Sequence, residues 1–486
     1  MAATSSEPKF SFKLVVHKEK NKVIYAEVNN HFVDTLFSIM TLPMATIVRL
    51  LRKRSSEKLK AIGSLNNVYD SLVNLSKNCL SSEENKWIML NPRSSSYEVC
   101  KKLQINIDDT TPMKYFICQD MGCSRRSGAR YSTCNLAKCY CGLQMDREVK
   151  YEELDDNARD DCDGGVFVSD VTKFIVTDDL RVMPNTLGCS FQLLRDQGIT
   201  EVNDLGNRTM DMGHDQILDL LQGAVLFKYP LSYMVFPENM VNTTKVTSDF
   251  KHVTSNEADT GSKKLTLKVT LQKSTSKLLY AEADSDFVEF VFGFLEIPLG
   301  TLIGNLMNCS SPFESLNNLY SSVSNSSIDE YLKSSNAKNM VVKPELEQKY
   351  ISVNQLFPIS VITASKCYCH SYLKDGAYNA SVARYPNREG HKDEMFCTLS
   401  LKDPRVDGRY LKTSAKFMLT DDLVITSVAS TSPFDILCNL KVPLTDVEEH
   451  TVNITIEDAL NILDASLKSS LALTDSIVKK ITETKK

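Results

Sequence analysis

The sequence of 486 residues lacks the short motifs that mark the commonest nucleotide-binding and hydrolytic enzymes. It contains no GxxxxGK[ST], no GxGxxG after an expected strand, no GxSxG and no HExxH. Histidine, the side chain most used for acid–base catalysis near neutral pH, occurs only seven times. These absences exclude the motif-bearing forms of P-loop nucleotide hydrolases, dinucleotide-dependent oxidoreductases, α/β-hydrolases and zinc metalloproteases.

Strong charge and long uncharged apolar runs are also missing. The formal net charge is −5, which gives no electrostatic reason to expect nucleic acid or an anionic membrane as a partner. The most apolar stretch, residues 287–306, contains Glu289, Glu296 and Pro298, so we expect packed helices there and no membrane span. The first residues do not show the basic and apolar segments of a secretory signal. We therefore expect an intracellular protein, cytoplasmic or nuclear, and not a secreted one.

The chain repeats itself in its second half. Residues 13–51 align without a gap onto residues 268–306, and 12 of the 39 aligned positions are identical. Three shorter matches follow in the same order: SLNNVY at 64–69 with SLNNLY at 315–320, KCYC at 138–141 with KCYC at 366–369, and KFIVTDDL at 173–180 with KFMLTDDL at 416–423. Four matches in one order predict a duplication of the whole unit.

The two repeat units are predicted to be homologous domains in tandem. We expect repeat domain one over residues 8–236, a polar linker over 237–262 and repeat domain two over 263–480. In each unit, apolar residues first alternate with period two and then recur at helical spacing, which predicts a β-hairpin followed by helices. The expected fold class is α+β, with hairpin-plus-helices modules around a small, mainly antiparallel sheet. Residues 8–236 are called the N-terminal half below, and residues 263–480 the C-terminal half.

Several of these segments together resemble a known family. They are the Tyr-Ala-Glu strand before an apolar helix, the Ser-Leu-x-Asn-x-Tyr helix, Ser124-Arg125-Arg126 before Cys139-x-Cys141, the Thr-Asp-Asp-Leu turn and the leucine-rich last helix. In this order they are similar to the land-plant family catalogued as domain of unknown function number 674, over about residues 8–480. The resemblance implies plant origin and tandem copies, and it implies no activity, ligand or catalytic residue. The C-terminal half departs from the fuller pattern because it lacks the first cysteine pair.

Four of the 14 cysteines form two close pairs. Four residues separate Cys118 from Cys123, and one residue separates Cys139 from Cys141. Two pairs of thiolates can supply the tetrahedral ligand set of zinc. These four residues are a candidate site for one structural zinc ion, in a ribbon over about residues 115–145. The alternative is a set of ordinary reduced thiols, since neither pair has the commoner two-residue spacing and a fifth cysteine lies nearby.

Basic residues gather at two places in the N-terminal half. Arg125, Arg126 and Arg130 lie between the two cysteine pairs and form a candidate basic patch. A second basic run, over residues 49–60, follows an expected helix. Cations are favoured near the C-terminal end of a helix by its dipole, so we interpret this run as a solvated helix end.

Paired carboxylates occur at matching places in the two halves. Asp178-Asp179 and Asp421-Asp422 each lie between two apolar runs that read as strands. Such pairs can bind a metal ion or act in acid–base catalysis, but aspartate is also a favoured turn residue. We predict that both pairs are turns between strands.

The leading functional interpretation is a non-enzymatic binding or scaffold module with a protein partner, because two linked domains suit bivalent binding. One alternative is an enzyme whose site lies in the cleft between the repeat units; it predicts a deep pocket with strongly shifted pKa values. The other is a zinc-ribbon nucleic-acid binder that uses Arg125, Arg126 and Arg130. That alternative predicts a contiguous basic face, and the acidic net charge argues against it. No catalytic residue and no cofactor besides zinc is expected.

Overall fold

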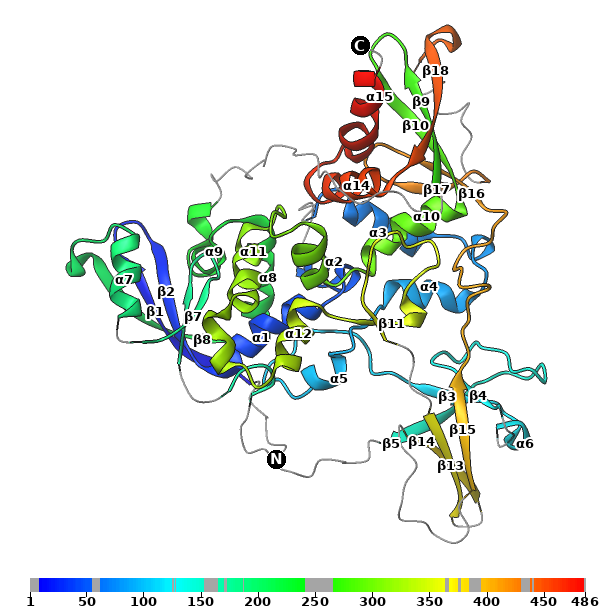
Figure 1. Cartoon of the computed structure of the whole chain (residues 1–486), viewed down its shortest axis with the longest axis horizontal. Coiled ribbons are helices and arrows are strands. Elements are labelled where there is room, and N and C mark those ends of the chain that lie inside the picture. Colours follow the sequence, from blue (N-terminus) through cyan, green and yellow to red (C-terminus); the bar gives the residue numbers. More distant parts are fainter. Residues whose placement is uncertain are drawn as a thin grey trace.

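The structure is a computed structural model that describes residues 8–54, 62–124, 126, 128–152, 165–169, 173–186, 188–240, 265–362, 367–374, 377–383, 395–429, 438 and 441–484. Three larger β-sheets lie around a central group of helices (Figure 1). This mixture of helices and mainly antiparallel sheets confirms the predicted α+β class.

Two five-stranded antiparallel sheets have corresponding strand orders. The first has the order β7-β6-β2-β1-β8 and consists of β1 (Phe10–His17), β2 (Lys22–Val28), β6 (Phe174–Thr177), β7 (Val182–Pro184) and β8 (Leu205–Met212). The second has the order β17-β16-β10-β9-β18 and consists of β9 (Leu265–Gln272), β10 (Lys277–Asp284), β16 (Lys416–Leu419), β17 (Ile425–Ser427) and β18 (Val447–Ile454). Strands from matching segments of the two halves therefore occupy matching places.

Both halves contribute helices to the centre of the molecule (Figure 1). The N-terminal half contains α1 (Asn30–Thr41), α2 (Met44–Arg54), α3 (Leu65–Asn74), α4 (Glu83–Leu90), α5 (Tyr97–Cys100), α6 (Met121–Ser124), α7 (Cys189–Asp196), α8 (His214–Leu226) and α9 (Pro230–Val235). The C-terminal half contains α10 (Ser285–Phe292), α11 (Glu314–Ser324), α12 (Ser335–Val342), α14 (Ile456–Lys468) and α15 (Lys479–Thr484). Of these helices, α7, α14 and α15 lie beside the two five-stranded sheets (Figure 1). Side chains that accept the backbone N–H of the third residue on begin α1 at Asn29 and α10 at Asp284.

The two halves meet through backbone hydrogen bonds near the start of α2. A short antiparallel bridge joins Pro43 to the corresponding proline of the C-terminal half. On either side of it, the N–H of Met44 donates to the carbonyl of Ile297 at 3.0 Å, and the N–H of Leu299 donates to the carbonyl of Leu42 at 2.9 Å. The largest hydrophobic cluster contains residues of both halves, so their apolar side chains are buried together.

The halves also exchange contacts between the SLNN helices and the TDDL turns. In α3, the side-chain amide of Asn67 donates to the carbonyl and the carboxylate of Asp422, at 2.7 and 2.9 Å. In α11, the amide of Asn318 donates to the carbonyl and the carboxylate of Asp179, at 3.0 and 3.2 Å. Each repeated helix thus holds the turn of the opposite half. The predicted domain limits remain a prediction, and most of the predicted linker, residues 241–262, lies outside the described residues.

The paired aspartates are turn residues, as predicted. Asp178 is buried in the turn between β6 and β7, and its carboxylate accepts the N–H of Ser232 at 2.7 Å. Asp421 accepts the N–H of Thr474 at 2.8 Å in the corresponding turn. Burial raises the pKa of both carboxyl groups, to about 6 for Asp178. Their hydrogen bonds give both pairs a structural role.

The third sheet contains strands of both halves in the order β3-β5-β14-β13-β15-β4. Its members are β3 (Tyr115–Ile117), β5 (Arg147–Glu152), β14 (Ala377–Ala383), β13 (Cys367–Lys374), β15 (Met395–Leu401) and β4 (Arg130–Tyr131). The halves join at two parallel pairings, β14 with β5 and β15 with β4. Backbone bonds between Phe116 and Ser132 connect the two ends of the sheet. A two-stranded sheet of β11 (Leu346–Glu347) and β12 (Val361–Ile362) lies apart from it.

None of the helices in the described part of the chain is long and apolar enough to span a bilayer. Within residues 287–306, α10 is followed by a short 3₁₀ segment and then, after Pro298, by a π-helical segment over Thr301–Leu306. The helices of this stretch pack into the protein core, as the interrupting charges and proline predict.

Candidate metal centre

The four clustered cysteines lie on two short segments at the end of the third sheet. Cys118 directly follows β3, and Cys123 lies in the single turn of α6. The second segment is a tight turn in which the N–H of Cys139 donates to the carbonyl of Leu143 at 2.8 Å. Gly142 closes this turn with φ of +87°, a backbone conformation that favours glycine. The turn therefore places its two cysteines at one tip, facing the first pair.

The two segments are held together by the backbone. The N–H of Gln119 donates to the carbonyl of Gln144 at 3.2 Å, which places the first segment beside the turn. The N–H of Met145 donates to the carbonyl of Ala137 at 2.8 Å and closes the base of the turn. Backbone hydrogen bonds thus fix the position of each cysteine pair before any ion is bound.

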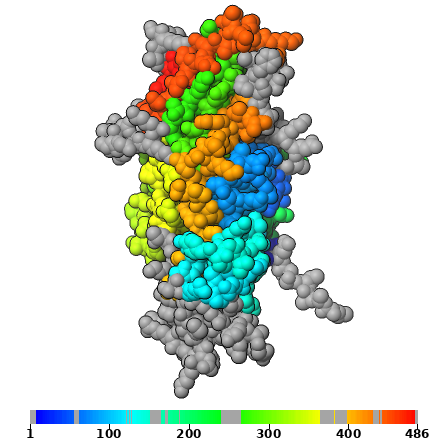
Figure 2. Space-filling view, turned by 90° about the vertical axis from the view of Figure 1, so that its right-hand side faces the viewer, coloured from blue at the N-terminus to red at the C-terminus, as the bar shows by residue number. Residues whose placement is uncertain are grey.

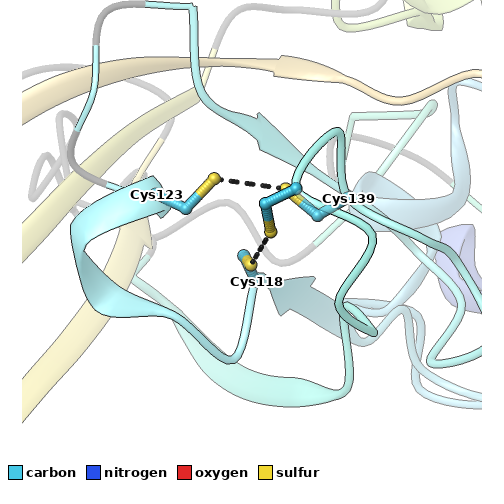
Figure 3. Close-up of side chains that lie close together, drawn as sticks. Cys118, Cys123 and Cys139 are labelled. Atoms are coloured by element: carbon cyan, nitrogen blue, oxygen red, sulfur yellow. Dashed lines mark hydrogen bonds between the residues drawn. The ribbon is translucent and has the colours of Figure 1, made fainter.

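The four sulfur atoms lie close together, and Figure 3 shows the side chains of Cys118, Cys123 and Cys139 gathered at one place. Cys118 Sγ lies 3.5 Å from Cys141 Sγ, and Cys123 Sγ lies 3.4 Å from Cys139 Sγ. All four lie within 4.8 Å of one another. A tetrahedral zinc ion with Zn–S bonds of about 2.3 Å separates its sulfurs by about 3.8 Å, so this arrangement fits the ion. The contacts are far longer than a disulfide of about 2.05 Å, and the four cysteines are free.

The thiols differ in burial and in acidity. Cys118 is buried, Cys123 and Cys139 are half-buried, and Cys141 is exposed. Burial acts to raise the pKa of Cys139, but hydrogen bonds from the backbone N–H of Cys141 and from the other thiols lower it to about 7. The Cys123 thiol donates to Cys139, and this hydrogen bond raises the pKa of Cys123 to about 11. A bound metal ion would displace the protons of the thiols, because zinc binds thiolate sulfur.

Cys134, the fifth cysteine of this region, lies outside the cluster. Its backbone N–H donates to the hydroxyl of Ser132 at 3.0 Å, and its carbonyl accepts from the same hydroxyl at 2.8 Å. These bonds fix a bend that follows β4. Cys134 therefore provides a natural control for substitutions of the clustered cysteines.

The candidate basic patch lies beside the cluster. Arg126 is exposed, and the guanidinium of Arg130 lies 4.5 Å from the ring centroid of Tyr140. Arg125 lies outside the described residues. The structure thus brings two of the three predicted arginines to the cysteine turn.

The cysteines and these cations line one cavity of about 560 Å³. The four sulfur ligands lie in its wall, together with Arg126, Arg130, Lys138, Tyr140 and Lys402. In Figure 2 the cyan segment that contains the cysteines lies at the surface, below the orange segment of the C-terminal half. Concave sites of this size are typical of small-molecule binding.

Lys402 was missed by sequence reasoning because it belongs to the C-terminal half. It follows β15, whose register places Leu401 opposite Tyr131. The N–H of Lys402 donates to the carbonyl of Tyr131 at 2.8 Å, and its ammonium donates to the carbonyl of Lys138. A strand pairing between distant segments therefore completes the cavity.

The described part of the basic run, residues 49–54, includes the exposed Arg52 and Lys53, as expected of a solvated helix end, and its cations also pair with carboxylates. Arg49 is bonded to Asp109 at 2.7 Å, and Lys53 is bonded to the same carboxylate. Arg54 binds Asp219 with two guanidinium nitrogens, at distances of 2.8 and 2.9 Å. These side chains fasten the end of α2 to neighbouring segments.

Two buried carboxylates that sequence reasoning did not single out are structural. Asp34 in α1 accepts the N–H groups of Phe167 and Val168, both at 2.8 Å. Glu289, at the matching position of α10, accepts the N–H of Leu411 at 2.6 Å. Burial raises the pKa of both groups. Their only sequence signal was an acidic residue at aligned positions within two apolar helices.

The sequence model of one protein family, described as "Protein of unknown function (DUF674)", matches residues 6–457. No curated protein and no solved structure matches the chain.

Proposed function

The chain belongs to the DUF674 family, whose description assigns no activity, and from that premise we propose that Cys118, Cys123, Cys139 and Cys141 hold one structural zinc ion. We further propose that the protein is an intracellular, non-enzymatic binding or scaffold module. The observation that carries the zinc proposal is the convergence of four sulfurs within 4.8 Å.

The donor set favours zinc in a structural role. Thiolate sulfur is a preferred ligand of zinc, and four sulfurs at tetrahedral spacing complete its coordination. Such an ion has no open position at which water could be activated, so it would stabilise the local fold and supply no catalysis. Among the side chains that the structure describes here, the hydrophobic cluster is small and consists of Ile117, Ala129, Tyr131, Val149 and Leu399 with two half-buried neighbours. A small core of this kind gains most from a metal ion.

Exposed apolar residues on the cysteine turn support a protein partner. Leu136 and Leu143 expose 47% and 46% of their surface on either side of the turn. A bound metal ion would already hold the turn rigid, so the two exposed leucines would lose less conformational entropy when a partner protein covers them. This surface is the one we propose for protein binding.

Cobalt titration of the apo protein tests the metal proposal. Four-thiolate cobalt sites absorb in the visible and give a strong thiolate-to-metal band, so the wild-type chain is expected to show both up to one equivalent. Cys118→Ser and Cys139→Ser should weaken or abolish these bands, while Cys134→Ser should leave them unchanged. A wild-type chain that shows no thiolate band would refute the proposal, and a band of equal strength in Cys118→Ser would refute the ligand assignment.

A further inference from the structure

The cavity beside the cysteine cluster is much larger than the metal ion requires. Its volume is about 560 Å³, whereas a single ion needs no more room than one water molecule, roughly 30 Å³. The remaining space is bounded by side chains from both halves, including Lys402 after β15. A second, larger ligand can therefore occupy it while the four sulfurs hold zinc.

The charge around the cavity points to an anionic ligand. Arg126, Arg130, Lys138 and Lys402 contribute four positive charges to its wall. A zinc ion with four thiolates carries a net charge of −2, so it neutralises only two of them. In the part of the chain that the structure describes, no carboxylate forms a salt bridge with any of the four cations. Glu84 lies near Lys402. Because burial raises the pKa of the Glu84 carboxyl to about 7, this group carries only part of a negative charge at neutral pH.

An aromatic ring lies at the same wall. Tyr140 exposes 74% of its surface, and its ring is contacted by the guanidinium of Arg130 at 4.5 Å from the centroid. Such a ring is a stacking surface for another aromatic group, and the arginine strengthens the stack. The site thus offers positive charge for phosphates and a ring for a base within one cavity.

We infer that this cavity binds a nucleoside di- or triphosphate. The phosphates are expected to contact Arg126, Lys138 and Lys402, and the base to stack on Tyr140. Arginine and lysine both recognise phosphate, arginine with two parallel hydrogen bonds. A single nucleotide fits the bounded volume, whereas a nucleic-acid strand would extend beyond it. The inference rests on the proposed zinc centre, because Tyr140 lies between two of its ligands, Cys139 and Cys141.

Calorimetric titration of the zinc-loaded full chain with ATP, without magnesium, tests the inference. We expect saturable binding to one site that weakens as salt is raised from 50 to 200 mM. Arg126→Gln and Lys402→Gln should each weaken binding by about 10- to 100-fold, the range of one charged hydrogen bond. Lys114→Gln is the matched control, since this exposed lysine of the same region pairs with Glu148 and lies outside the cavity. It should leave the affinity unchanged.

Two further ligands separate the parts of the inference. Inorganic pyrophosphate should bind more weakly than ATP, and Tyr140→Ala should weaken ATP but not pyrophosphate. Equal affinity for both ligands in wild type and in Tyr140→Ala would overturn the nucleoside part. A single-stranded oligonucleotide that binds more tightly than ATP, increasingly so with length, would overturn the inference in favour of nucleic acid.

Zinc content, measured on every variant, keeps this test apart from that of the metal centre. If the wild-type chain contains one zinc ion and binds no ATP, the inference is wrong and the zinc proposal stands. If the four cysteines bind no metal, the zinc proposal itself is wrong.

Discussion

Substitution of Asn67 and Asn318 tests whether the contacts between the two halves stabilise the fold. Asn67→Ala removes hydrogen bonds of 2.7 and 2.9 Å to Asp422, and Asn318→Ala removes bonds of 3.0 and 3.2 Å to Asp179. In each case one acceptor is a backbone carbonyl and the other a carboxylate, and the sites are half-buried. Such bonds contribute about 1 kcal/mol and about 1.5 kcal/mol or more, so each substitution should lower the free energy of unfolding by about 2–3 kcal/mol.

Urea unfolding with two probes measures this effect. The only tryptophan, Trp87, lies in α4 of the N-terminal half and reports on the surroundings of that helix, whereas far-UV circular dichroism reports on the whole chain. Because Asn318 belongs to the C-terminal half but binds the N-terminal one, Asn318→Ala should shift both transitions together. Asn207→Ala, at an exposed position of edge strand β8, should shift neither.

Two results would refute this reasoning. An unfolding midpoint that does not move in Asn67→Ala or Asn318→Ala would show that the exchanged contacts add no stability. Separate transitions by the two probes, with only the dichroism shifted in Asn318→Ala, would show that the halves unfold independently, as two domains on a linker would.

Two other changes have expected outcomes. Gly142→Ala should strain the cysteine turn by about 1–2 kcal/mol and weaken zinc binding about tenfold, because alanine is strained at φ of +87°. A competition titration with a chelating dye measures the zinc affinity. Gly188→Ala is the control, since Gly188 has an ordinary φ and lies in open space. Burial raises the pKa of Glu296 to about 8, so the folded state retains a proton that the unfolded state has lost. The free energy of unfolding should therefore fall as the pH rises from about 4.5 to 8, by up to about 5 kcal/mol. Glu296→Gln should flatten that fall in urea titrations at pH 5, 7 and 9, and an unchanged slope would contradict the burial of an acidic group there.

The parts of the fold that depend on local pattern could be predicted from the sequence. Alternating apolar residues predicted β1 with β2 and β9 with β10, and two aspartates between apolar runs predicted the turns at 178–179 and 421–422. The exchange of contacts between halves could not be predicted, because Asn67 and Asp422 are 355 positions apart. Nothing in a repeated motif indicates whether it binds its own copy or the other.

The residues of the candidate site could likewise be predicted only in part. Close spacing indicated that the four cysteines could meet, since each pair lies within one short segment whose turn brings its sulfurs together. Lys402 could not be assigned to the site, because only the pairing of β15 with β4 places it there. At the end of α2, the exposure of Arg52 and Lys53 agrees with the predicted solvated helix end. The carboxylates that pair with the cations of this helix, Asp109 and Asp219, could not be predicted because they belong to distant segments.

X-ray absorption at the zinc edge, with elemental analysis of the same purified full-length protein, tests the metal centre most directly. We predict one zinc ion per chain in wild type and in Cys134→Ser, with four sulfur ligands at about 2.3 Å. Cys118→Ser and Cys139→Ser should lose the ion or replace a sulfur by a lighter ligand. A wild-type chain without zinc, or zinc bound mainly by nitrogen and oxygen, would contradict the account.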